Sequence, residues 1–291
     1  MPGPYRLGLP VWANPAWRGG LFRRLARPSD YLGQYAAAFD AVEGNTTFYH
    51  APDDATVQRW RARTPPGFAF CFKMPRQISH ELRLAGAARD LALGFMDTLA
   101  PLADRMGPTL VQLPPDFGPG EVDALIRFLE ALPTAPGGYA VEVRHPRLHG
   151  DGAAEHALEA ALTALGVDRA FMDTRALRTT PDEHPDARDA RTRKPNLARR
   201  PYCTGPRPFV RFVGTREVAP NGPWLDEWAG TVARWIGEGR TPHFFVHTPG
   251  DLWAPQVARA FHERLALRLG LGPLGDFAGE AEPSAEQLSL L

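Results

Sequence analysis

Several short apolar runs of this sequence end in a side chain that can carry charge or exchange a proton. An acidic group at the end of a buried strand costs free energy unless another group pairs with it or uses it. Arg and Lys side chains that converge on a pocket suit a phosphate or carboxylate, and paired carboxylates suit acid/base work. The terminal groups are Glu43 and Asn45, Lys73, Gln112, Glu142 and Arg144, Asp173, Arg211, and His247.

Lysine is rare in this chain, and its two positions therefore stand out. Of the 33 basic residues, two are lysines (Lys73 and Lys194), which leaves 31 arginines. Arginine does not deprotonate usefully and differs in shape, so a site that needs a compact or titratable ammonium would keep lysine. We interpret Lys73 and Lys194 as candidate functional residues, with chance survival as the alternative.

The apolar runs have the length and composition of buried parallel strands. Each is four to eight residues long, rich in Val, Phe and Leu, and closed by Pro, Gly, Asp or Asn. Amphipathic stretches at 121–132, 224–236 and 254–269 alternate with them. The runs occupy residues 5–12, 38–45, 68–75, 109–115, 139–146, 169–174, 209–214 and 243–248.

Eight strands with helices between them predict a single-domain α/β protein, a (β/α)8 barrel of the TIM type. A doubly wound open sheet is the alternative, but the first run is followed by no Gly-rich phosphate-binding turn. Barrel enzymes carry their chemistry at the C-terminal ends of the strands. Because side chains alternate along a strand, Glu142 and Arg144 share one face, and so do Glu43 and Asn45. We therefore expect a ring of polar groups at the barrel mouth, either as a functional site or as a self-satisfied network of ion pairs.

Two segments interrupt the alternation of strands and helices. Residues 175–208 form a long basic loop with nine basic and four acidic residues, interpreted either as a lid over the mouth that contacts phosphates or as a solvated cap. Residues 271–286 are rich in Gly, Ala, Pro and Glu, which predicts a flexible segment. The expected organisation is a barrel at 1–270 with the insertion at 175–208, and a flexible tail at 271–291.

Bulk composition limits the class of protein and its compartment. The formal net charge is zero, so the whole molecule is not a generic polyanion binder. No signal peptide or membrane span is expected, and neither Cys71 nor Cys203 belongs to a CxxC motif. These features predict a cytoplasmic protein.

Eight motifs together resemble one family, the YecE-like barrels known as domain of unknown function 72. They are "GLPVWANPAW", "VEGNTTFY", "FCFKMPRQISH", "LVQLPPDFGP", "VEVRHP", "DARTRKPN", "FVRFVG" and "HTPGDLWAPQVARAFHERL", in this order over nearly the whole chain. The resemblance implies a TIM-type barrel and no particular activity. The widespread form of the family has an Asn pair after the eighth strand. Here His247 stands at that place, as in the subgroup with the long RKP loop.

The residue types suggest a division of roles within the predicted mouth. Acid/base chemistry, or binding of a divalent Mg²⁺, Mn²⁺ or Zn²⁺, would use carboxylates and histidine from separate strands. Aromatic side chains at the rim would stack on a base or sugar, or simply pack. The candidate catalytic residues are Glu43, Lys73, Glu142, Asp173 and His247, and the candidate substrate-binding residues are Trp12, Asn45, Tyr49, Arg76, Gln112, Arg144, Lys194 and Arg211.

Two classes of function fit this pattern. The first is an enzyme that acts on a phosphate-bearing substrate, such as a nucleotide or nucleic-acid derivative, as a phosphoester hydrolase or as a lyase or isomerase. The second is a non-catalytic module that binds a nucleic acid or a partner through the same charged mouth. Convergence of the polar groups on a pocket favours the enzyme.

The last residues, "EQLSLL", predict a protein partner. An apolar terminus after a polar segment is poorly explained by solubility. The stretch resembles the peptide that binds the bacterial sliding clamp, with Leu where that peptide prefers Phe. The matching residues are Gln287, Leu288, Ser289, Leu290 and Leu291.

Overall fold

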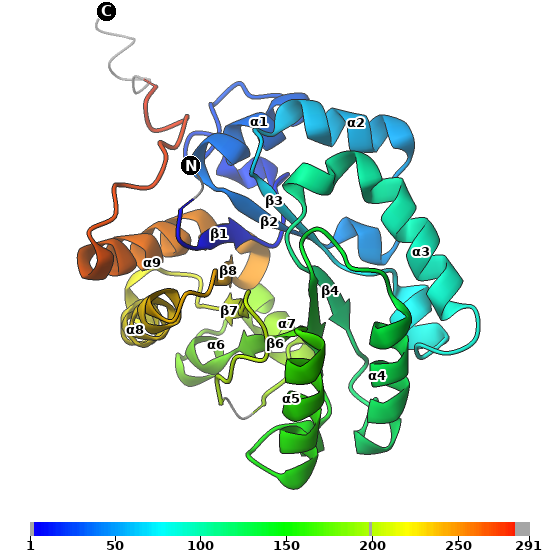
Figure 1. The fold of residues 1–291 in the computed structure, drawn as a ribbon. Coiled ribbons are helices and arrows are strands. Elements are labelled where there is room, and N and C mark those ends of the chain that lie inside the picture. The colour runs from blue at the N-terminus through cyan, green and yellow to red at the C-terminus, as the bar shows by residue number, and fades with distance from the viewer. Residues whose placement is uncertain (1–2, 198–199, 283–291) are drawn as a thin grey trace, which may run out of the picture.

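Eight parallel strands form a barrel in the computed structural model, which describes residues 3–197 and 200–282 (Figure 1). They follow the order β3-β2-β1-β8-β7-β6-β5-β4. Two bridges, Phe70–Met106 and Lys73–Leu110, join β3 to β4 and bring the edges of the sheet together. The predicted (β/α)8 barrel is therefore confirmed, and the open-sheet alternative is wrong. The strands are β1 (Arg6–Leu9), β2 (Ala41–Gly44), β3 (Ala69–Phe72), β4 (Thr109–Gln112), β5 (Tyr139–Glu142), β6 (Asp168–Asp173), β7 (Phe209–Val213) and β8 (His243–His247).

Helices follow every strand and surround the barrel. The stretches predicted at 121–132, 224–236 and 254–269 are α4, α8 and α9, and the tryptophan stripe of α8 is core, with Trp228 and Trp235 buried against the sheet. The helices are α1 (Pro28–Ala38), α2 (Asp54–Arg63), α3 (Ala88–Leu99), α4 (Val122–Ala131), α5 (Ala153–Leu165), α6 (Arg175–Thr179), α7 (Pro185–Arg193), α8 (Gly222–Gly237) and α9 (Ala254–Leu269).

The barrel interior is filled by small side chains and a few phenylalanines. Its apolar cluster is separate from the clusters beneath the helices. A β-carbon at Gly8 would lie 2.2 Å from the Ala41 carbonyl oxygen, so β1 can approach β2 only with glycine there. The interior cluster consists of Ala41, Ala69, Cys71, Leu110, Ala140, Ala170, Phe209 and Phe245. Because side chains alternate along each strand, the residues two positions further along each strand also face inward, towards the mouth.

The insertion at 175–208 is not the irregular loop that the sequence suggests, because it contains α6 and α7. Arg191 donates to the backbone carbonyls of Leu177, Thr180 and Asp182, which ties α6 to the turn before α7. An apolar contact of Leu177 and Ala190 with Val213 seats these two helices on the barrel. Several arginines of this segment thus satisfy backbone carbonyls rather than facing an open surface.

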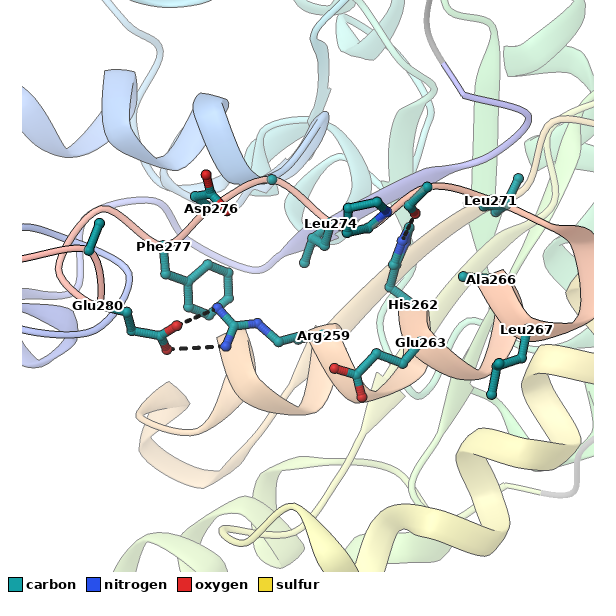
Figure 2. Close-up of a pocket in the computed structure, with 14 residues that line it drawn as sticks. Arg259, His262, Glu263, Ala266, Leu267, Leu271, Leu274, Asp276, Phe277 and Glu280 are labelled. Carbon is teal, nitrogen blue, oxygen red and sulfur yellow. Dashed lines mark hydrogen bonds and ion pairs between the residues drawn. The ribbon is translucent and has the colours of Figure 1, made fainter.

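The end of the chain also differs from the prediction. Residues 271–282, here called the C-terminal strap, pack along α9 and α1, so the expected flexible tail is wrong for these twelve positions (Figure 1). Phe277 is 1% exposed and packs against Phe39. Arg259 lies over the Phe277 ring at 3.6 Å and forms an ion pair with Glu280 (Figure 2). Residues 283–291 lie outside the described residues.

A cavity of 780 Å³ lies between the strap and α9, away from the strand ends that carry the polar residues. His262 Nε2 donates to the Gly272 carbonyl at 2.8 Å, which anchors the start of the strap (Figure 2). The other ring nitrogen, Nδ1, shares a hydrogen bond of 2.6 Å with the Tyr5 hydroxyl. Within residues 3–197 and 200–282, no helix combines the length and the apolar character needed to cross a membrane.

We expect Phe277→Ala to lower the free energy of unfolding by about 3 kcal/mol, the usual cost of truncating a buried phenylalanine. Leu267→Ala on the outer face of α9 is the matched control, because that side chain is 88% exposed, and it should change stability by about 0.5 kcal/mol or less. Chemical denaturation of both variants measures the difference. Equal, small effects would mean that the strap contributes no stability in solution.

Candidate active site at the barrel mouth

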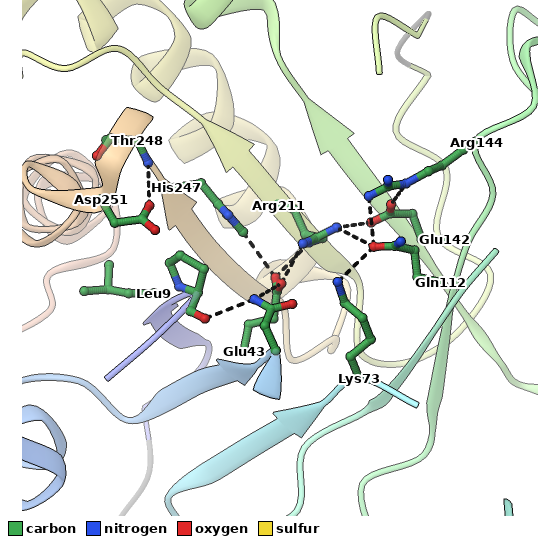
Figure 3. A network of polar contacts seen from close by, with 12 residues as sticks. Leu9, Glu43, Lys73, Gln112, Glu142, Arg144, Arg211, His247, Thr248 and Asp251 are labelled. Carbon is green, nitrogen blue, oxygen red and sulfur yellow. Dashed lines mark hydrogen bonds and ion pairs between the residues drawn. The ribbon is translucent and has the colours of Figure 1, made fainter. Parts of the chain in front are cut away.

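Arg211 on β7 lies at the centre of the polar network (Figure 3). Its Nε and Nη2 donate to the two carboxylate oxygens of Glu43 on β2 at 2.8 and 2.6 Å. Its Nη1 donates to Glu142 Oε2 on β5 at 2.5 Å. All three side chains are almost completely buried. The cost of burying an acidic group at the end of β2 is thus offset, because the Glu43 carboxylate forms a two-point ion pair across the barrel.

Gln112 on β4 joins the cations of the network. Its Oε1 accepts from Lys73 Nζ at 3.0 Å, from Arg144 Nη2 at 2.9 Å and from Arg211 Nη1 at 3.4 Å. Arg144 also donates from Nε to Glu142 Oε1 at 2.6 Å. One amide oxygen therefore holds three cationic groups close to one another, and the terminal Nη1 of Arg144 has no hydrogen bond within the described chain.

Glu43 has two further neighbours that fix its orientation. Asn45 Nδ2 donates to Glu43 Oε1 at 2.9 Å and to the Pro10 carbonyl at 3.0 Å. His247 Nε2 lies 3.2 Å from Glu43 Oε2. Burial lowers the pKa of His247 to about 4, with Lys194 and Arg211 acting in the same direction and Glu43 opposing them. His247 is therefore neutral at pH 7 and donates one hydrogen bond to the carboxylate.

The two carboxylates stay ionised at neutral pH. Burial alone would raise the pKa of Glu142, but the guanidinium groups of Arg211 and Arg144 outweigh it and lower the value to about 2. Burial would likewise raise the pKa of Glu43, and Arg211 together with His247 brings it well below the usual range. Neither group is suited to give a proton at pH 7.

Lys73 is different, because it titrates near neutral pH. Burial lowers the pKa of its amine to about 7, and Arg211 adds to the effect, while Glu43 and Glu142 oppose it. The ammonium lies 4.9 Å from the centre of the Phe48 ring and donates only to Gln112 within the described residues. A buried amine with this pKa can serve as a base or nucleophile near pH 7.

Lys194, which follows α7, also faces the mouth. Burial lowers its pKa to about 8, Arg211 acts in the same direction, and Glu43 and Asp251 oppose them. Its amine has no hydrogen bond or ion pair with any residue that the structure describes. Both lysines of this arginine-rich chain thus lie at the mouth with lowered pKa values.

Four predicted site residues lie outside the network. Asp173 faces outward, where it accepts from Trp228 Nε1 at 2.8 Å and pairs with Arg175, so its predicted place in the mouth is wrong. The inward positions of β6 are Ala170 and Met172, and Asp173, as the next residue, faces the opposite side.

Two further predicted residues, Arg76 and Trp12, have partners outside the network. Arg76 pairs with Glu81 on the surface, and the centres of the Trp12 and Trp60 rings lie 5.4 Å apart.

Tyr49, the fourth of these residues, is 70% exposed and lies at the rim. Together with Phe48 and Arg76 it lines a groove of 620 Å³. Because Phe48 also contacts Lys73, this groove adjoins the network from outside. The aromatic side chains therefore separate into a packing residue, Trp12, and two residues that line the groove.

Asp251 is a site residue that the sequence analysis missed. It follows β8, accepts from the Thr248 amide at 3.1 Å, and has a left-handed φ of 54° (Figure 3). Such a conformation costs a residue with a β-carbon about 1 kcal/mol and often marks a functional segment. Burial raises the pKa of its carboxyl to about 6, with Lys194 opposing. The only signal in the sequence is its place just after the eighth strand.

A divalent metal does not fit these side chains. Among the residues that the structure describes, no three His, Cys, Asp or Glu side chains converge as a ligand set. The carboxylates of Glu43 and Glu142 are separated by the guanidinium of Arg211, which takes up the oxygens that a cation would need. We therefore derive no chemistry through a metal.

We expect Lys73 and Lys194 to titrate near pH 7 and pH 8, well below the usual lysine value of about 10.4. The ¹³Cε shifts of protein labelled with [ε-¹³C]lysine measure this directly, because the chain has only two lysines. Lys73→Arg and Lys194→Arg assign the two signals. Titration of both signals above pH 10 would contradict the buried environment described here.

Comparisons with known proteins agree with the fold and the motifs. The model of the family described as "Protein of unknown function DUF72" matches residues 6–276. The UPF0759 protein YecE of Escherichia coli (strain K12) is 38% identical over 263 residues, which cover 90% of this chain and 93% of that protein. The YecE protein of E. coli O157:H7 is 37% identical over the same shares.

Solved structures of other family members have the same fold. A crystal structure of a DUF72 family protein from Enterococcus faecalis has a TM-score of 0.69 at 17% identity, covering 92% of this chain and 96% of the other. One from Thermotoga maritima has a TM-score of 0.64 at 21% identity, covering 92% and 99%. On the evidence of its sequence matches over most of its length, this chain is a YecE-like member of the DUF72 family.

Proposed function

We propose that this chain is an enzyme that binds a small phosphate-bearing substrate at the barrel mouth and transforms it with Lys73 as the titrating group. The observation that carries the proposal is a set of cationic groups at the mouth whose N–H donors are not all used by carboxylates. Lys73 donates only to an amide oxygen, Arg144 keeps Nη1 free, and Lys194 has no polar partner within the described residues. Donors of this kind are suited to a phosphate group.

The groups of the mouth then have different roles. Arg211, Glu43 and Glu142 form a fixed ionic floor, because each charge is satisfied by another. Arg144 and Lys194 hold the phosphate, and Lys73 moves a proton to or from the substrate. The groove lined by Phe48, Tyr49 and Arg76 offers space for the remainder of the substrate, including the base of a nucleotide.

A lyase or isomerase reaction fits these roles better than phosphoester hydrolysis. Hydrolysis of a phosphoester by a water that a metal or a carboxylate activates is disfavoured here, because both carboxylates are already engaged by Arg211. An amine with a pKa near 7 is instead suited to abstract a proton next to a carbonyl group.

A non-catalytic binding module is the second candidate. It is favoured by the near-complete pairing of Glu43, Glu142 and Arg211, since such ionic networks also occur in proteins that only bind. The two functions differ in one result, because a binding module would hold the ligand and return it unchanged.

We expect phosphorylated sugars and nucleotides to raise the melting temperature, and their unphosphorylated counterparts to have no effect. Arg144→Gln should weaken binding about tenfold, which corresponds to the loss of one charge-assisted hydrogen bond. Arg89→Gln on the exposed surface of α3 is the matched control and should bind as the wild type does. Affinity should fall as the pH rises through about 8, because Lys194 then loses its charge.

Thermal shift and titration calorimetry measure these effects, and mass spectrometry of the incubated ligands detects turnover. Equal stabilisation by phosphorylated and neutral compounds, or equal losses in the two arginine variants, would remove the anion site. Binding without any chemical change across the panel would favour the binding module.

The proposed link to a sliding clamp rests on sequence alone, because Gln287, Leu288, Leu290 and Leu291 lie outside the described residues. In such peptides the Gln makes polar contacts and the apolar side chains enter preformed pockets. We expect a labelled 280–291 peptide to bind a bacterial sliding clamp in a fluorescence titration. The peptide with Gln287, Leu288 and Leu290 changed to Ala should not bind, and indistinguishable behaviour of the two peptides would rule out the link.

A further inference from the structure

The backbone of Lys73 is fixed by hydrogen bonds at the junction of β3 and β4 that closes the barrel, here called the barrel seam. Its backbone amide donates to the Gly44 carbonyl at 3.1 Å, and its carbonyl accepts from Thr47 Oγ1 at 2.7 Å. The next amide, of Met74, donates to the Leu110 carbonyl on β4 at 2.9 Å. A reactive group on a backbone held by β2 and β4 is well positioned for chemistry that needs a fixed geometry.

The amine of Lys73 lies in surroundings that disfavour its charge. Its head contacts the face of Phe48, and the one oxygen to which it donates is shared with the guanidinium groups of Arg144 and Arg211. Neither Glu43 nor Glu142 is within ion-pair distance of it. A lysine beside other cations and in an apolar wall is the arrangement that leaves the nucleophilic amine unprotonated.

Lys194 offers an internal contrast. Burial and Arg211 lower the pKa of both lysines, and two carboxylates oppose this effect in each case. Lys194 differs because it lies on the segment after α7 rather than on the barrel seam, and because its pKa of about 8 leaves it mostly charged at pH 7. Its charge and its place beside the mouth suit it to hold an anion. Lys73 is therefore the better candidate for a nucleophile, and Lys194 is the better candidate for a group that binds an anion.

Building on the proposed function, we infer that Lys73 condenses with the carbonyl carbon of a small anionic aldehyde or ketone to form an imine, while Arg144 and Lys194 hold the anionic group of that substrate. The amine lone pair attacks the carbonyl carbon and forms the C–N bond of a carbinolamine. The carbonyl oxygen then leaves with the two amine protons as water. The resulting imine, once protonated, accepts electrons from the neighbouring carbon.

This step defines the substrate class and the reaction class. A protonated imine stabilises negative charge on the adjacent carbon, so the bonds that become labile are the C–H and C–C bonds at that carbon. The substrate is therefore a carbonyl compound with a phosphate or carboxylate, and the reaction is a carbon–carbon lyase or an isomerase. No oxidant, reductant or metal is required for the cycle.

Reductive trapping tests the imine directly. The full-length protein is incubated at pH 7 with glyoxylate, a small carbonyl acid, or with pyridoxal 5′-phosphate, an aldehyde that bears a phosphate. Sodium borohydride then reduces any imine to a stable secondary amine, and peptide mapping by mass spectrometry locates it. The chain has only Lys73, Lys194 and the N-terminal amine to distinguish.

We expect the adduct at Lys73, with about fivefold more label there than at Lys194. At pH 7 about half of an amine of pKa 7 and about one tenth of an amine of pKa 8 is unprotonated. Lys73→Arg should abolish this adduct, Lys194→Arg should keep it with lower affinity for the probe, and pyridoxal without its phosphate should label weakly. Labelling of the wild type is read without any variant, so a variant that folds poorly does not affect the conclusion.

Two failures can be told apart. Pyridoxine 5′-phosphate carries the phosphate but no aldehyde, and its protection of the site or its effect on melting temperature reports the anion site alone. If it binds but neither carbonyl probe labels Lys73, the imine is overturned and the proposed anion-binding enzyme survives. If it does not bind and labelling is confined to the N-terminal amine, both are overturned.

Discussion

The contact of Arg211 with Glu43 and Glu142 is the interaction on which the mouth of the barrel depends. It joins β7 to β2 and β5 across the interior, at the level where apolar side chains no longer fill the space. A buried charge without its partner costs about 3–5 kcal/mol, so no member of this group can be removed without penalising the others. The three strands must therefore keep one register relative to one another. Arg211, Glu43 and Glu142 form a floor of the mouth that is rigid and takes no part in proton transfer.

The same contact explains why reactivity is left to the lysines. Arg211 satisfies both carboxylates and keeps them ionised, and its own positive charge helps to depress the pKa values of Lys73 and Lys194. Gln112 holds Lys73 beside two guanidinium groups, because its single oxygen accepts from all three cations. The position of Arg211 therefore has two effects, because it keeps the buried carboxylates ionised and it makes the lysine amines easier to deprotonate.

The sequence predicted the barrel and most of its mouth, because strand ends and side-chain alternation follow from local patterns. Alternation failed at Asp173, since nothing in "RAFMD" shows whether Met172 or Asp173 faces inward, and a shift of one residue exchanges the two faces. The basic composition of residues 175–208 did not predict the role of Arg191. An arginine that donates to backbone carbonyls cannot be distinguished by sequence from one that binds a phosphate. Composition failed again at Phe277, a buried apolar anchor within a segment whose Gly, Ala and Pro content predicts disorder.

The path of the C-terminal strap connects the two faces of the barrel. Gly275 lies against Ala37 at the end of α1, whereas the amides of Ala278 and Gly279 donate to Leu21 and Gly20, and Glu282 accepts from the Arg24 amide. Residues 20–24 belong to the connection that leaves the C-terminal end of β1, so the strap climbs from the closed base of the barrel to its open face. At Glu282 the strap therefore lies on the side of the barrel that carries the polar strand ends, and its twelve residues tie the base of the barrel to the first connection after β1.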